Sequence, residues 1–502
     1  MSENRRYALW SGLTVAGFAL FRAVVMGTSG LGDSESYYWT WAKHPALSYF
    51  DHPPLTAWLI HLSTAIGGDT SFWVRLPSLL LFVVTSWLLY RLCVELFDDR
   101  RIAFLSILTF NLIPMFAIGA LQMVPDIPAA ACYIAFVILA RRVLENDGPG
   151  WIWLVMGAVM GMGLLGKYFA ILLLPSVMIL TAAVPSYRHW YLRPEPYLMG
   201  LVALIFFSPV IWWNYSHDWP SFKFQLVTRH TGRPFTAYTF GRLFGGQALY
   251  VMPLYLIGLL WGVYAGVRAA MKGDTRHALL ATFSIPTLAF FYIVTAWTEQ
   301  AEPHWPAFGY LTAIIMMTER GLAAIEEPGN GAKKWMGKYF AAATAMAVAI
   351  FALFYIHVYY PILPIKPKYD IVNELYGWDL AGVEITKAYD RLTAEGGGAK
   401  PFALAHHWVL CSQIMFATKN KIEVACLNEK TDQFDFWDDE TKMIGRSAVM
   451  VSDLRFEAPP EELYLFDSAR KVAEVPFVRG GVVTRKFTIW EIKGFKGRKH
   501  RG

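Results

Sequence analysis

Long apolar runs dominate the first 360 residues of this chain. A membrane-spanning helix needs roughly 20 mainly apolar residues, and eleven segments match this pattern or are slightly shorter. They lie near residues 7–26, 73–93, 102–121, 126–142, 151–166, 168–184, 197–214, 246–267, 278–296, 306–322 and 339–359. The pattern therefore predicts a polytopic α-helical membrane protein with about eleven transmembrane helices. The first segment has no small-residue cleavage site, so we expect a retained anchor rather than a signal peptide.

Basic residues in the short loops predict the orientation. If the N-terminus, with Arg5 and Arg6, lies inside and the segments alternate, every short basic cluster falls on the cytoplasmic side, as the positive-inside rule requires. These clusters are Arg100 and Arg101; Arg141 and Arg142; Arg188 and Arg193; Arg268, Lys272 and Arg276; and Lys333, Lys334 and Lys338. The same alternation places residues 27–72, residues 215–245 and everything after about residue 360 outside.

The pattern changes at about Pro361, where apolar runs shorten to strand length and charges become frequent. Strands are predicted near residues 402–406, 422–426, 448–452 and 482–490, with a helix over Trp408–Thr418. The chain is thus predicted to have a multi-span membrane domain over residues 1–360 and a small extracytoplasmic α/β domain over residues 361–492. Residues 493–502 are basic and are predicted to form a disordered tail.

Composition narrows the class of protein. Hydrophobic residues make up 55% of the chain and charged residues 17%, whereas typical soluble domains are about 25% charged. The net charge of +6 is explained by cytoplasmic loops, and no nucleic-acid partner is expected. Of the four cysteines, Cys93 and Cys132 lie in apolar segments. Cys411 and Cys426 lie in the C-terminal domain and could pair if it faces an oxidising compartment.

The first predicted outer loop concentrates charged and aromatic residues. It reads Asp33-Ser34-Glu35-Ser36-Tyr37-Tyr38-Trp39, followed by Tyr49-Phe50-Asp51-His52-Pro53-Pro54-Leu55. Residues 37–42 contain neither Pro nor Gly, and they could form a helix that lies on the membrane surface. The two prolines stop one element and begin another, because proline fits the first turn of a helix.

This loop resembles the first outer loop of bacterial glycosyltransferase family 39, which is related to the protein O-mannosyltransferases and the lipid A aminoarabinose transferases. The resemblance continues, in matching order, at Pro125-Asp126-Ile127-Pro128, at Gly166-Lys167-Tyr168, at His304–Tyr310 and at Gln433–Trp437. It implies a GT-C membrane fold, a polyprenyl-phosphate sugar as donor and a multi-pass location in the bacterial inner membrane. One departure matters: the family pattern has adjacent Asp and Glu, whereas Ser34 separates Asp33 from Glu35 here.

Transfer of a sugar from such a donor needs a base for the acceptor hydroxyl and cations for the departing phosphate. Asp33 or Glu35 is the candidate catalytic base. The candidate substrate-binding residues are Asp51, His52, Asp126, Lys167, Arg229, Arg233 and His304, with Arg242 as a weaker candidate. Plain structural alternatives stay open, since Asp126 could favour a helix dipole, Lys167 could snorkel to the interface, and His304 could pack beside Trp305.

A divalent metal is an open prediction. Asp33, Glu35 and Asp51 could supply oxygen ligands, with His52 adding nitrogen. These residues lack a diagnostic spacing such as that of two histidines one helical turn apart.

The sequence therefore favours an inverting membrane glycosyltransferase that acts on the outer face. Its acceptor would be a hydroxyl or phosphate of lipid A or lipopolysaccharide, of another glycolipid, or of a protein. A polyprenyl-lipid transporter or flippase is the alternative, but it usually carries ionisable residues near the middle of its spans, and few charges lie there. A receptor or anchor would need only one or two spans. The sugar, the acceptor and the oligomeric state are not determined by the sequence.

Overall fold

The computed structural model describes residues 2–145, 148–228, 236–296, 302–327, 333–396 and 399–499. They fold into two compact units. The helical unit comprises Met1–Val24, Leu47–Thr56 and Leu76–Ala352, and the mixed unit comprises Val25–Ala46, Ala57–Arg75 and Leu353–Gly502. Most of the first predicted outer loop thus belongs with the C-terminal region, whereas the sequence had assigned that loop to the membrane domain.

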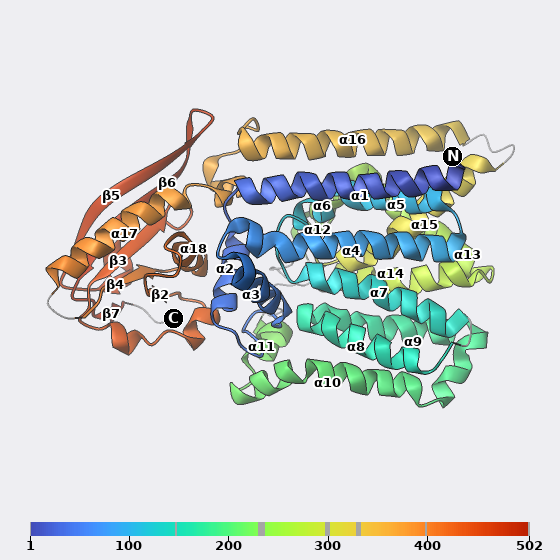
Figure 1. Ribbon diagram of the computed structural model, residues 1–502, viewed down its shortest axis with the longest axis horizontal. Coiled ribbons are helices and arrows are strands. Elements are labelled where there is room, and N and C mark those ends of the chain that lie inside the picture. Colours follow the sequence, from blue (N-terminus) through green and yellow to red (C-terminus); the bar gives the residue numbers. More distant parts are fainter. Residues whose placement is uncertain are drawn as a thin grey trace. The chain divides into compact units, whose positions relative to one another are not determined.

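Long helices make up the helical unit, as Figure 1 shows. Helices α1, α3, α4 and α16 each continue from one unit into the other. The helices lying wholly or partly in the helical unit are α1 (Glu3–Thr28), α3 (Leu55–Gly67), α4 (Ser71–Phe97), α5 (Arg100–Leu112), α6 (Pro114–Gly119), α7 (Asp126–Glu145), α8 (Trp151–Gly166), η1 (Tyr168–Leu172), α9 (Leu173–Ala183), η2 (Pro185–Leu192), α10 (Glu195–Ser216), α11 (Pro220–Lys223), η3 (Phe224–Thr228), α12 (Ala237–Val251), α13 (Pro253–Met271), α14 (Thr275–Ala296), α15 (Ala307–Glu326) and α16 (Lys333–Tyr359).

The prediction of a polytopic helical protein is confirmed. Within the described ranges, eight helices are long and apolar enough to cross a membrane: α1, α4, α7, α10, α13, α14, α15 and α16. The other three predicted segments are helical but shorter or interrupted. Segment 102–121 divides into α5 and α6, because Pro114 begins a new helix. Segment 151–166 is the 16-residue α8, and segment 168–184 comprises η1 and α9, followed by a 119° bend into η2.

A five-stranded sheet forms the centre of the mixed unit, in the order β2-β1-β3-β6-β5. β1 pairs in parallel with β2 and β3, and β6 pairs antiparallel with β3 and β5. The remaining elements of this unit are α2 (Asp33–Lys43), η4 (Pro367–Tyr369), η5 (Ile371–Leu375), α17 (Trp378–Glu395), β1 (Phe402–Ala405), α18 (Trp408–Ala417), β2 (Val424–Cys426), η6 (Gln433–Phe436), η7 (Glu440–Met443), β3 (Ala448–Asp453), α19 (Pro460–Leu463), β4 (Tyr464–Leu465), β5 (Ser468–Arg479), β6 (Val482–Lys493) and β7 (Gly497–Arg498). The small α/β domain is therefore confirmed, and it contains α17 and β5 in addition to the predicted elements.

The sheet is covered by a buried apolar cluster and by two helices. Successive side chains of a strand point to opposite faces, so Phe402 and Leu404 lie on one face, in a buried cluster with Met450 and Phe495. The helices α17 and α18 pack against the sheet, and Trp378 of α17 contacts Phe487 of β6, with ring centroids 4.7 Å apart. The parallel β1–β2 pair needs a crossover connection, which α18 supplies.

The end of the chain corrects the prediction of a disordered tail from residue 493. β7 pairs with β4, the side chain of Phe495 is fully buried, and Arg498 forms an ion pair with Glu440 at 3.0 Å. The buried aromatic ring outweighs the basic composition, so the chain is folded at least to Lys499. Residues 500–502 lie outside the described residues.

The cysteines of the C-terminal domain are free. Cys411 and Cys426 are both buried, and neither forms a disulfide in the structure. Burial raises the pKa of both thiols, which disfavours the reactive thiolate.

Candidate functional site

Helix α2 carries both candidate carboxylates. It begins after Gly32, whose N–H donates to the Glu35 carboxylate at 3.0 Å and so caps the first turn. Tyr37 joins α2 to the C-terminal elements, since its hydroxyl accepts the N–H of Gln433 at 2.8 Å and its ring stacks on Phe434. The helix forms as predicted, but most of its side chains are buried inside the mixed unit. The Gln433–Trp437 motif thus contributes contacts that hold α2 in the mixed unit.

Glu35 is completely buried and paired with Arg75. The guanidinium of Arg75 donates to the carboxylate of Glu35, with a shortest distance of 2.7 Å. Arg75 also donates to the carbonyl oxygens of Ser29 and Gly30. Arg75 is itself 2% exposed, so this ion pair fixes the start of α2 in an environment without water. The position is better suited to holding the loop than to exchanging protons with a substrate.

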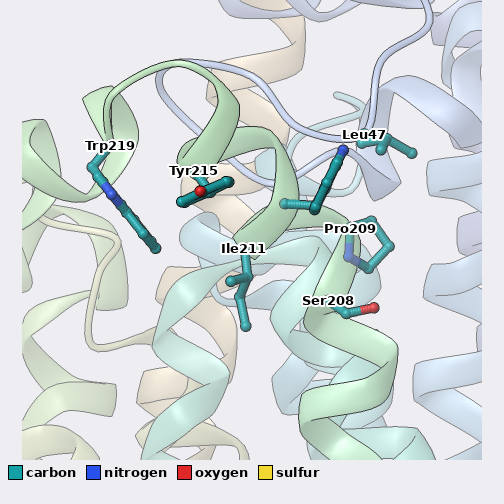
Figure 2. A pocket seen from close by; sticks show the side chains of 7 residues that line it. Leu47, Ser208, Pro209, Ile211, Tyr215 and Trp219 are labelled. Atoms are coloured by element: carbon teal, nitrogen blue, oxygen red, sulfur yellow. The ribbon is translucent and has the colours of Figure 1, made fainter.

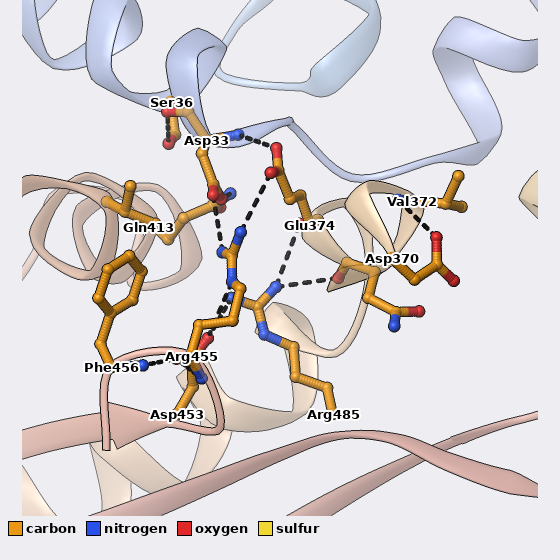
Figure 3. A network of polar contacts seen from close by, with 12 residues as sticks. Asp33, Ser36, Asp370, Val372, Glu374, Gln413, Asp453, Arg455, Phe456 and Arg485 are labelled. Atoms are coloured by element: carbon orange, nitrogen blue, oxygen red, sulfur yellow. Dashed lines mark hydrogen bonds and ion pairs between the residues drawn. The ribbon is translucent and has the colours of Figure 1, made fainter. Parts of the chain in front are cut away.

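Asp33 lies at the start of α2 in a second network, which Figure 3 shows. Its carboxylate accepts hydrogen bonds from Arg455 at 2.7 Å and from Gln413 at 3.3 Å. Arg455 follows β3 and also forms an ion pair with Glu374 at 3.1 Å. Asp33 is 6% exposed and its neighbour Ser34 is exposed, so this carboxylate lies nearer the surface of the unit than Glu35 does.

The network around Arg455 contains more acids than bases. Asp33, Glu374 and Asp453 face the guanidinium groups of Arg455 and Arg485, and Arg485 pairs with Asp453 at 2.7 Å. If all five groups are charged, one negative charge is uncompensated. Burial, and after it the charge of Asp33, together raise the pKa of Glu374 to about 7. Glu374 therefore takes up a proton near neutral pH.

A separate ion pair lies in the helical unit, where Lys167 contacts Asp126 at 2.6 Å. Asp126 is the first residue of α7. Lys167 has extended backbone angles and ends α8, and its ammonium lies 5.4 Å from the centre of the Phe169 ring. His304 lies 3.9 Å from Asp126. The structure thus brings together three of the predicted substrate-binding residues, which lie far apart in the sequence.

The Asp51–His52 segment is held through its backbone. The hydroxyl of Ser221 donates to the carbonyl oxygens of Tyr49 and Phe50, each at 2.7 Å, and the side-chain amide of Gln225 donates to the carbonyl of Asp51 at 2.6 Å. All three contacts are to backbone carbonyl oxygens, so they do not orient the Asp51 carboxylate. The segment is therefore fixed in position by residues of α11 and η3.

An apolar groove of about 660 Å³ lies along α10 in the helical unit. Figure 2 shows its lining side chains. They are Leu47, Ser208, Pro209, Ile211, Trp212, Tyr215 and Trp219. Trp212 and Tyr215 are both more than 60% exposed. Such a surface suits a hydrocarbon chain better than a polar ligand.

The chain is similar to several known glycosyltransferases. A family model described as dolichyl-phosphate-mannose-protein mannosyltransferase matches residues 51–213. The lipid A galacturonosyltransferase RgtD of Rhizobium johnstonii is 25% identical over 308 residues, which cover 61% of this chain and 64% of that protein. The structure of ArnT from Cupriavidus metallidurans bound to undecaprenyl phosphate aligns with 96% of this chain and 98% of that one, with a TM-score of 0.63 and 13% identity. The chain is therefore similar to glycosyltransferases of the kind that family 39 contains. The structural likeness shows the GT-C fold.

The chain matches only part of the length of these relatives. The undecaprenyl phosphate-alpha-4-amino-4-deoxy-L-arabinose arabinosyl transferase of Pectobacterium carotovorum is 24% identical over 329 residues, which cover 62% of this chain and 58% of that protein. The chain thus matches less than two thirds of the length of both this relative and RgtD.

The remaining predicted site residues are the arginines of the third outer loop and the possible metal ligands. Arg229 and Arg233 lie outside the described residues, whereas Arg242 is described and exposed. Among the residues that the structure describes, no group of three or more His, Cys, Asp or Glu side chains is placed to hold a metal ion. A metal at Asp33, Glu35 or Asp51 therefore stays an untested prediction.

The sequence did not identify the partners of the α2 carboxylates. Arg75 carried one signal, because a charged residue at the start of an apolar span is costly unless it has a function or a partner. Arg455, Glu374 and Gln413 carried none, since they lie in ordinary mixed sequence of the C-terminal region. Their roles follow only from the folded structure.

The pKa of Glu374 gives a prediction for the pH dependence of stability. Because this pKa rises from 4.5 to about 7 on folding, the folded protein binds the proton more tightly than the unfolded chain. Ionisation of Glu374 therefore lowers the free energy of unfolding progressively as the pH rises from about 4.5 to about 7. Above about pH 7 this loss of stability stays constant. Glutamine does not titrate, so we expect the melting temperature of Glu374→Gln relative to the wild type to be higher at pH 8 than at pH 5.

Thermal unfolding of the detergent-purified protein at the two pH values measures this difference. Glu384→Gln on α17 is a suitable control, because Glu384 forms an exposed pair with Lys387. Its melting temperature relative to the wild type should change little between the two pH values. If the Glu374→Gln difference were equally constant, Glu374 would not titrate as the network requires.

Proposed function

We propose that this chain is a membrane glycosyltransferase that moves a sugar from a polyprenyl-phosphate donor to lipid A or a closely related lipid. The observation that carries the proposal is the buried Lys167 ammonium held by Asp126 beside His304, in a unit built from apolar spans. The names of the relatives support the substrate classes, since one is a lipid A galacturonosyltransferase and another uses an undecaprenyl phosphate sugar.

Lys167 and His304 are proposed to bind the donor phosphate. When the bond between the anomeric carbon and the phosphate oxygen breaks, the phosphate leaves with the electron pair and gains negative charge. Cations already fixed in place stabilise that charge without reorganising. The apolar groove along α10 is proposed to accept the hydrocarbon chain of the donor.

Asp33 is proposed as the general base and Glu35 as a positioning residue. The acceptor oxygen would attack the anomeric carbon while its proton passes to the Asp33 carboxylate. A single displacement of this kind inverts the anomeric configuration. Glu35 is fully enclosed with Arg75, whereas Asp33 lies beside exposed Ser34 and is held by Arg455 and Gln413. These contacts would keep the Asp33 carboxylate oriented between turnovers.

The proposed setting is the bacterial inner membrane, with the N-terminus in the cytoplasm and the reaction on the outer face. The basic clusters of the short loops support this orientation through the positive-inside rule. The partners are the polyprenyl-phosphate sugar, the acceptor lipid and the surrounding membrane lipids. The mixed unit would then lie outside the cytoplasm.

A transfer assay tests the proposal. Purified protein in nanodiscs is incubated with radiolabelled polyprenyl-phosphate sugars and lipid A, and we expect label from at least one donor to enter the lipid A fraction. If no donor is consumed but labelled polyprenyl phosphate crosses sealed vesicles containing the protein, the chain is a transporter instead.

Lys167→Gln is the variant that tests the phosphate contact. We expect kcat/KM to fall roughly tenfold to hundredfold, because one preorganised cation is lost at the leaving group. Lys272→Gln, the same change at an exposed lysine after α13, should retain wild-type activity. A Lys167→Gln protein with normal kcat/KM would show that this lysine is only a structural partner of Asp126.

A further inference from the structure

The last turn of α16 is joined to the β5–β6 hairpin by a buried polar junction. Arg479, next to the hairpin turn, forms an ion pair with Asp370 at 2.8 Å, and Asp370 also contacts His357 of α16 at 3.2 Å. All three side chains are less than 10% exposed. The hydroxyl of Tyr376 donates to the carbonyl of Val358 at 2.7 Å. These contacts fix the hairpin turn beside the end of α16, where Figure 1 shows it.

The hairpin turn also packs closely against the segment that follows α16. Gly480 and Gly481 have φ angles of 57° and 81°, which fit a two-residue turn between twisted strands. A Cβ at Gly480 would lie 2.8 Å from Cδ of Pro361, so a side chain there would force the two segments apart. The turn and the segment after α16 therefore form one continuous surface.

That surface is apolar and exposed. Six large side chains define what we call the interfacial patch: Tyr360, Ile362, Ile365, Tyr369, Val478 and Val482. Their exposed fractions range from 43% to 70%. Single exposed apolar residues are ordinary on protein surfaces, but a contiguous group marks a binding surface.

The exposed charges within residues 360–371 of the interfacial patch have one sign. Lys366 and Lys368 are exposed, whereas the one acid between Tyr360 and Ile371, Asp370, is buried in the junction. Exposed tyrosine and lysine beside apolar side chains are the composition found where proteins meet lipid headgroups.

The position of the patch along the chain identifies what covers it. α16 is long and apolar enough to cross a membrane and ends at Tyr359. The six residues that follow can extend at most about 20 Å from the end of α16. The buried polar junction holds the hairpin turn next to that same end of α16. We propose that the interfacial patch rests in the boundary between headgroups and acyl chains of the membrane that α16 spans, with Lys366 and Lys368 on anionic headgroups.

A spin label on Val482→Cys tests the proposal in nanodiscs that each hold one protein, where a second copy cannot cover the patch. We expect collisions with oxygen, relative to a water-soluble nickel chelate, to be several-fold more frequent there than at Ser468→Cys. Ser468 is exposed at the opposite end of β5, roughly 34 Å along the strand from Val478. Wild-type protein treated identically gives the background from the native cysteines.

Two further measurements keep the proposal falsifiable. Tyr360→Cys carries the label on the segment after α16, in case a label on the hairpin disturbs its turn. In the wild-type background, lipid contact at residue 482 should increase with the share of anionic lipid, and the double variant Lys366→Gln, Lys368→Gln should lose that dependence. Equal accessibility at residues 360, 482 and 468 would overturn the proposal. Shielding of residue 482 from both oxygen and the chelate would also overturn it, because the patch would then be covered by protein.

Discussion

Asp33→Asn is expected to reduce kcat of the transfer reaction by about 10²- to 10⁴-fold, the contribution typical of a positioned general base. The variant should remain folded. Asn keeps an oxygen that can accept from Gln413, and loss of the Asp33 charge leaves two acids, Glu374 and Asp453, facing Arg455 and Arg485. The excess of negative charge in this network would therefore disappear. Initial rates at saturating donor and acceptor, with a melting temperature for each protein, measure both parts of the expectation.

Ser34→Ala is the matched control for this experiment. Ser34 is the exposed neighbour of Asp33 on the same turn of α2, so its variant should transfer sugar at the wild-type rate. If Asp33→Asn retained full activity while folded, Asp33 would be only an anchor for Arg455, and the base would have to be sought elsewhere.

Glu35→Gln is expected to lower stability first and activity as a consequence. The change leaves the guanidinium of Arg75 buried without its carboxylate partner, and breaking a buried ion pair by removing one member typically costs about 3–5 kcal/mol. The variant should melt well below the wild type and give less folded protein on extraction. Activity per folded molecule should fall less than it does for Asp33→Asn.

A double-mutant cycle with Arg75→Met separates the pair from other effects. Arg75→Met leaves Glu35 buried without its charged partner. The sum of the two single-variant losses in free energy of unfolding should therefore exceed the loss in the double variant. The double variant will still lose the contacts of Arg75 with Ser29 and Gly30, so full recovery is not expected. A Glu35→Gln protein with wild-type melting temperature and no transfer would assign the chemistry to Glu35 instead.

The C-terminal region supplies residues that directly contact the candidate site on α2. Arg455, Glu374 and Gln413 contact Asp33 or its neighbours on α2, and Phe434 packs on Tyr37. Deleting the region after α16 would therefore remove the partners of Asp33 and expose the aromatic face of α2. Point variants at the contacts described here are more informative than deletion.

The amino-acid sequence by itself determined the spans, the strands and the presence of a motif on α2. Long apolar runs such as the one in α4 partition out of water wherever they lie in the chain, and short alternating runs such as β6 form strands for similarly local reasons. Proline positions also located the start of α3. The order of motifs further indicated a resemblance to membrane glycosyltransferases, which the relatives bear out.

Only the tertiary structure decided which partner each carboxylate has. Asp33 and Glu35 are two residues apart and look equivalent in the sequence, yet Asp33 meets Arg455, 422 positions away, and Glu35 meets Arg75. The same is true of the ordered end of the chain, where Phe495 is buried despite its basic neighbours. A buried charge must be paired, but which residue supplies the opposite charge depends on how distant segments pack, and no local pattern records that.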